Sequence, residues 1–173
     1  TVFAGIAPVS VGGDSIAGTI VAETPAAVFA EPGQGSLAKG EIGAYYRSNG
    51  NAMGGNVSAT FATESFSITY TGATAESDNY QAGRDFKTSP VTGREGHSLP
   101  LDEVGSTAYK SRNHELAIAF KGGIHLVEAK VGYQEIPYQL WPNQRMDMLD
   151  NVQQRLNLRY RGAFGWGTLE ARA

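Results

Sequence analysis

Apolar and polar residues alternate along most of this chain, with the period of two that a strand shows when its side chains point to opposite faces of a sheet. In residues 115–121, Leu116, Ile118 and Phe120 alternate with charged or small residues. The period of 3.6 residues expected of an amphipathic helix is nearly absent. The alternation predicts seven strands, at residues 41–47, 56–63, 66–71, 115–121, 125–133, 155–161 and 168–173.

The connections between these predicted strands are short and long in turn. Short turns are expected at residues 63–65, 122–123 and 162–167, and longer loops at 48–55, at about 73–105 and at about 134–151. An antiparallel meander with this spacing places the short turns at one end of the sheet and the longer loops at the other. The expected groups are the turns near Glu64, Gly122 and Phe164, and the loops near Ala52, Val91 and Gln144.

The two faces of the predicted sheet differ in chemistry. One face carries aliphatic side chains, and the other carries full charges of both signs in the middle of strands. Neighbouring strands can pair such charges, as in the wet lumen of a barrel. The side chains expected on the first face are Ile68, Leu116, Ile118, Val127, Val131, Leu156 and Leu158, and those expected on the second are Glu128, Lys130, Arg155 and Arg159.

A soluble β-sandwich also alternates, so the alternation alone leaves two architectures open. Connections that are short and long in turn are typical of outer-membrane barrels, and so are aromatic residues near strand ends. The pattern therefore predicts an all-β fold: an antiparallel meander of about seven strands from a transmembrane β-barrel, in contact with the lipid of a bacterial cell outer membrane. The aromatic residues concerned are Tyr45, Tyr46, Tyr70, Tyr133, Tyr160 and Trp166.

Composition removes several other classes of protein. The net charge of −3 does not favour a nucleic-acid binder. The chain has no cysteine, which excludes disulfides, thiolate catalysis and cysteine-ligated zinc within it. No apolar run approaches the roughly 18 residues of a membrane helix. The common nucleophile, metalloprotease, P-loop and dinucleotide motifs are missing, so we expect neither an enzyme nor a bound cofactor.

The segment PVSVGGDSIAGTI, residues 8–20, breaks the alternation with glycines, an acid and a serine. It resembles the C-terminal end of the plug domain of TonB-dependent outer-membrane receptors, although Ala17 stands where that family often has glycine. The segments SNGN at 48–51, IPYQLWPNQRMDMLDN at 136–151 and LNLRYRG at 156–162 are similar to the subgroup of these receptors linked to copper.

This resemblance implies a domain organisation and a function. Residues 1–24 would be the C-terminal end of the plug, 25–38 a linker, and 39–173 the N-terminal part of the barrel. The chain would be a fragment of a plugged barrel of about 22 strands. The whole receptor would take up a metal ion or metal chelate actively, and would contact the TonB complex through an N-terminal region missing here. The alternatives are a passive porin-like barrel and a soluble all-β binding module.

The candidate metal ligands lie in two predicted loops. Met146 and Met148 flank Asp147, and their soft thioethers suit Cu(I) as the transported substrate. The alternative is that both methionines pack inside the loop. His97, in the first long loop, is the third candidate ligand, and its alternative is a solvated side chain. Tyr138 and Trp141 stand beside prolines, and such a stiff aromatic loop suits a siderophore equally well.

Overall fold

The computed structural model describes residues 2–5, 18–20, 25–142 and 146–173. Its first element is a small antiparallel pair, β1 (Val2–Ala4) with β2 (Gly18–Ile20). Of the segment 8–20 that resembles a plug terminus, only residues 18–20 are described, so the interpretation of 8–17 lies outside the described residues.

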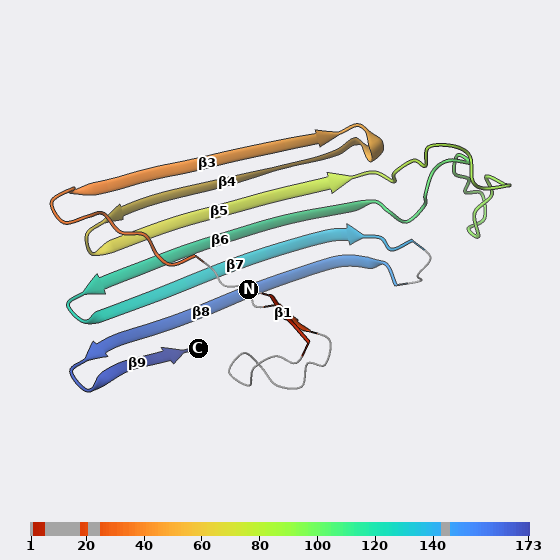
Figure 1. Ribbon diagram of the computed structural model, residues 1–173. Coiled ribbons are helices and arrows are strands. Elements are labelled where there is room, and N and C mark those ends of the chain that lie inside the picture. The colour runs from red at the N-terminus through yellow and green to blue at the C-terminus, as the bar shows by residue number, and fades with distance from the viewer. Residues whose placement is uncertain (1, 6–17, 21–24, 143–145) are drawn as a thin grey trace.

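The main element is a seven-stranded sheet in which each strand pairs antiparallel with the next one in sequence (Figure 1). The predicted all-β antiparallel meander is therefore confirmed. Its strands are β3 (Ser36–Arg47), β4 (Ala52–Thr63), β5 (Phe66–Ser77), β6 (Tyr109–Gly122), β7 (His125–Gln139), β8 (Met148–Phe164) and β9 (Gly167–Arg172).

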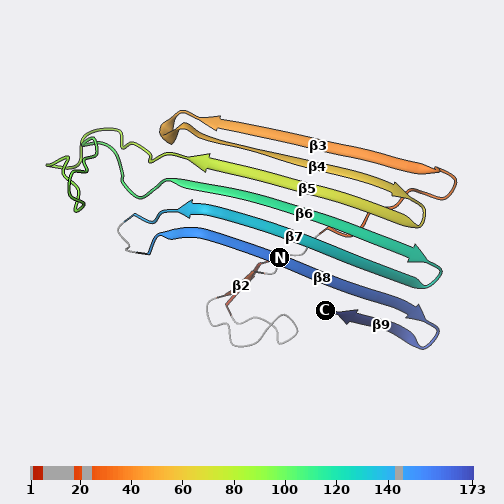
Figure 2. The ribbon, with the colours of Figure 1, turned by 180° about the vertical axis from the view of Figure 1, so that it is seen from behind.

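The connections lie at the two ends of the sheet as predicted. The tight turns β4–β5, β6–β7 and β8–β9 share one end, and the other three connections share the opposite end (Figures 1 and 2). We call these the turn end and the loop end. The β3–β4 connection at the loop end contains a short 3-10 helix, η2 (Asn49–Asn51). None of the helices in the described part of the chain is long and apolar enough to cross a membrane.

The predicted bounds of the strands were wrong at the loop end, where the strands extend further. Residues 52–55 and 73–77, expected in loops, belong to β4 and β5. Likewise β7 continues to Gln139 and β8 begins at Met148. These extensions lack apolar alternation, but backbone pairing does not require it. β3 also begins at Ser36, inside the range 25–38 expected as a linker.

The register of the sheet confirms the predicted separation of the faces. Ile68 pairs with Ile118, whose other neighbour Ala129 pairs with Leu158. Leu116, Val131 and Leu156 form a second such row. Glu128 pairs with Arg159 on the opposite face. We call the first the apolar face and the second the polar face.

Burial on the two faces is inverted relative to a soluble protein. On the apolar face Ile42 is 85% exposed and Leu156 is 62% exposed. On the polar face, by contrast, Ser67 is 2% exposed and Glu128 is 6% exposed. The buried apolar residues among those described are all alanines: Ala30, Ala52, Ala62 and Ala119.

Residues 25–30, which we call the strap, contribute to the burial on the polar face. The strap crosses the sheet near the turn end, over β4 to β6 (Figure 1). Its Ala30 N–H donates a hydrogen bond to the Thr63 carbonyl oxygen at 3.1 Å. The Lys121 ammonium lies 4.5 Å from the centre of the Phe29 ring, a cation–π contact. The strap therefore covers part of the polar face near the turn end, while the apolar face stays open.

Candidate functional site

The polar face carries an ion-pair network beside a row of hydroxyl groups. Arg159 Nη1 lies 3.2 Å from Glu128 Oε2, and its Nε lies 3.2 Å from Glu170 Oε1. Four residues earlier on β8 and on the same face, Arg155 Nη2 lies 3.0 Å from Glu115 Oε2. The hydroxyl oxygens of Thr60 and Thr69 are 2.9 Å apart on adjacent strands. A hollow of about 230 Å³ lies between these polar-face side chains and the strap. The polar face is therefore fit to line a water-filled or polypeptide-filled interior.

The structure places the predicted metal ligands in two separate segments of the chain. His97 is exposed in the β5–β6 loop, where its Nδ1 lies 3.3 Å from Thr92 Oγ1. Met146 lies in the β7–β8 connection and is 75% exposed, and Met148 opens β8. Among the residues that the structure describes, no three His, Asp or Glu side chains form a metal-binding group. The metal site at Met146, Met148 and His97 stays a prediction.

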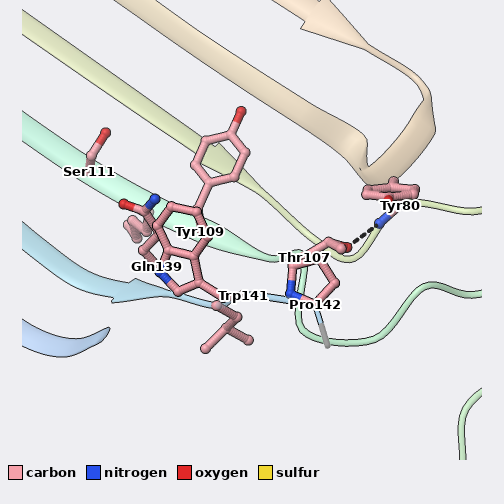
Figure 3. A pocket seen from close by; sticks show the side chains of 9 residues that line it. Tyr80, Thr107, Tyr109, Ser111, Gln139, Trp141 and Pro142 are labelled. Carbon is pink, nitrogen blue, oxygen red and sulfur yellow. Dashed lines mark hydrogen bonds between the residues drawn. The ribbon is translucent and has the colours of Figure 1, made fainter. Parts of the chain in front are cut away.

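A second hollow, of about 440 Å³, lies at the loop end, where β6 and β7 meet the long loops (Figure 3). We call it the loop-end hollow. The register places Tyr109 and Gln139 opposite each other on the polar face, with Ser111 two residues further along β6. Its lining residues are Tyr80, Thr107, Tyr109, Lys110, Ser111, Gln139, Leu140, Trp141 and Pro142.

Hydrogen bonds to the backbone hold the walls of this hollow. Asn79 Oδ1 accepts from the backbone N–H groups of Thr107 at 2.9 Å and Ala108 at 3.1 Å. Thr107 Oγ1 in turn accepts from the Tyr80 N–H at 3.0 Å, as Figure 3 shows. On the other side, Asp147 Oδ1 accepts from the Trp141 N–H at 3.1 Å. The Asp147 carboxylate, expected beside a metal, thus fixes the turn that carries Trp141.

A register shift at Pro137 shapes the same region. Lys110 pairs with Tyr138 and Arg112 pairs with Glu135, so two residues of β7 lie opposite one residue of β6. Pro137 is one of the two, and it has no N–H to give to the sheet. The bulge therefore falls where the sheet already lacks the hydrogen bond of one backbone N–H group. A bulge of this kind bends its strand, here the end of β7 beside the loops.

The sequence indicated part of this site. Trp141 was expected to stand in a stiff, substrate-facing loop, and it lines the hollow. Tyr80, Thr107 and Tyr109 were missed, because no local pattern relates them to residues 139–142.

No protein-family model matches this chain, and no curated protein or solved structure matches it either. A functional assignment therefore rests on the residues, their burial and their contacts.

Proposed function

We propose that this chain is the plug terminus and the first barrel strands of a TonB-dependent outer-membrane receptor. The whole receptor would take up a metal ion or metal chelate, with copper as one candidate, and would draw energy through the TonB complex. One observation carries the proposal: the apolar face of the sheet is open, while a strap of the same chain covers part of the charged face. Lipid and a filled lumen are the surroundings that suit these two faces.

Side chains along the strands support a membrane band on the apolar face. At its loop-end border Tyr70 hydroxyl and His114 Nδ1 are 2.7 Å apart, and at its turn-end border His125 Nδ1 and the Tyr160 hydroxyl are 2.7 Å apart. His125 pairs with Gly122, so the band covers the nine residues 114–122 of β6. A tilted strand needs about 9–11 residues to span a bilayer.

Charges return to the apolar face just beyond the loop-end border. Lys110 Nζ lies 2.6 Å from Glu76 Oε2, and Arg112 Nη1 lies 3.0 Å from Glu135 Oε2. Polar and paired groups are expected where a strand leaves the hydrocarbon and enters water. This distribution supports a membrane band that ends at this border.

The strap favours a plugged receptor over a passive porin. In a porin the polar face lines an open aqueous channel, and strap residues would obstruct it. A soluble module is disfavoured for another reason: the apolar face would need a cover of comparable area. A porin therefore requires an unobstructed channel, and a soluble module requires a cover over the apolar face. Each alternative can be tested separately.

The face assignment can be tested with adjacent spin labels, because the chain has no cysteine of its own. We expect Leu158→Cys to place a label in lipid and Asn157→Cys to place one in the lumen, since these residues point to opposite faces. The intact protein, reconstituted in lipid vesicles, is measured by electron paramagnetic resonance with oxygen and a water-soluble nickel chelate. Oxygen should dominate relaxation at 158, and the nickel chelate should dominate at 157.

Two results would overturn this proposal. Dominance of the nickel chelate at both positions would mean a soluble module. A steady ion conductance of the intact protein in planar bilayers would mean a passive channel, whereas a plugged receptor stays closed.

A further inference from the structure

We infer that the loop-end hollow binds a neutral saccharide, with a sugar ring stacked on Trp141 and its hydroxyls bonded to Ser111 and Gln139. Figure 3 shows Tyr109, Gln139 and Trp141 at the adjoining ends of β6 and β7, around one space. The volume of about 440 Å³ falls within the range of small-molecule sites, about 300–1,000 Å³.

The walls of the hollow favour an uncharged ligand. Lys110 is the one charged residue among those that line it, and Glu76 already holds its ammonium at 2.6 Å. A metal cation would find no carboxylate in this lining, and an anion would compete with Glu76 for the ammonium. The remaining lining is aromatic, aliphatic or neutral polar.

Hydrogen-bonding groups in the hollow are available to a ligand. Within the described part of the chain, the hydroxyl of Ser111, the amide of Gln139 and the indole N–H of Trp141 have no hydrogen-bond partner. A pyranose ring has C–H groups on its faces and hydroxyls around its rim. An aromatic face with neutral donors and acceptors beside it matches both parts.

The site is held in place before a ligand arrives. The Leu140 N–H donates to the Ala108 carbonyl oxygen at 3.0 Å, which ties the two walls together. Asp147 fixes the turn at Trp141 in the same way. A pre-organised site loses less conformational entropy when a ligand binds. A weak stacking interaction can then give a measurable affinity.

This inference goes beyond the proposed uptake of a metal and does not depend on it. The hollow uses none of Met146, Met148 and His97, and a soluble module would present the same lining. Metal binding and saccharide binding can therefore fail separately.

Titration calorimetry of the intact protein tests the inference, with cellotriose, maltotriose and chitotriose as probes and a detergent without sugar groups. We expect at least one probe to bind the wild type, and Trp141→Ala to weaken that binding by about tenfold or more. Trp141→Phe should retain most of the affinity, since it keeps an aromatic face. Gln139→Leu should weaken binding as well, because it removes a hydrogen bond but keeps the volume.

Trp166 supplies the matched control. It lies in the β8–β9 turn at the opposite end of the sheet, stacked on Phe164 with ring centres 5.1 Å apart. Trp166→Ala should leave saccharide affinity unchanged. The inference is overturned if none of the three probes binds the wild type at millimolar concentration, or if Trp141→Ala binds as the wild type does. Tighter binding of 2,3-dihydroxybenzoate at the same tryptophan would also overturn it, in favour of an aromatic anion.

Discussion

Glu128 shows at the scale of a single residue how the polar face is organised. Its side chain is buried on the polar face, and its carboxylate lies 3.2 Å from the guanidinium of Arg159. A buried carboxylate is unfavourable unless it is paired. Glu135 forms a similar pair with Arg112 at 3.0 Å on the apolar face, but both partners there are partly open to solvent. The two pairs differ mainly in burial.

Removing the buried carboxylate should therefore cost more than removing the open one. We expect Glu128→Ala to lower the free energy of unfolding by about 1–3 kcal/mol, because Arg159 loses a buried partner and keeps only Glu170. Glu135→Ala should cost less than about 1 kcal/mol. Urea unfolding of the intact protein, followed by tryptophan fluorescence, measures both. Equal losses would show that burial does not strengthen the Glu128 pair.

At the scale of elements, the sequence predicted the central part of each strand and the order of the connections. Alternation identifies a strand whose two faces have different surroundings. On β6, for example, Leu116 points to the apolar face and Glu115 to the polar face. It fails at the loop end, where residues 73–77 have water or protein on both sides and still pair with β6. Local patterns also could not join Tyr80 to Trp141, because only the bulge and the long loop bring them to one hollow.

Gly54 marks a close approach within the sheet that the sequence alone did not show. A Cβ at this position would lie 2.8 Å from the Thr74 carbonyl oxygen and 2.5 Å from Cε1 of the Tyr45 ring. The ring can turn away, but the carbonyl belongs to the neighbouring strand. Tyr45 pairs with Gly54 across β3 and β4, so the ring covers the gap left by the missing side chain.

Gly54→Ala should consequently destabilise the sheet by about 1–3 kcal/mol, through overpacking against the backbone. Gly40→Ala is the matched control in the adjacent strand, where the nearest atom would be the Ser58 carbonyl oxygen at 3.4 Å. The control should be neutral or slightly stabilising, since alanine loses less backbone entropy than glycine. Thermal unfolding of the intact protein by circular dichroism compares the two. A Gly54→Ala variant as stable as Gly40→Ala would contradict the tight approach.

At the scale of the whole molecule, the sheet formed by the described residues has two open edges, which a closed soluble domain avoids. The outer edges of β3 and β9 have no partner strand in the described part of the chain. Open edges present unpaired backbone groups, which further strands would satisfy in the proposed barrel. In that barrel the loop end would form the outward mouth, and the loop-end hollow and the β7–β8 connection both lie at this end.

The proposed cargo can be tested at this mouth, through the three methionines of the chain. Met146 is largely exposed and Met148 opens β8, so both methionines lie at the loop end. We expect Met146→Leu with Met148→Leu to weaken Cu(I) binding by the intact protein about tenfold or more, because leucine keeps the volume but removes the sulfur. Met53→Leu, on the apolar face of β4, is the control and should bind Cu(I) as the wild type does. Competition with a Cu(I) chelator measures the affinities. Unchanged affinity in the double variant would make these methionines packing residues, and the cargo would then have to be recognised elsewhere in the receptor.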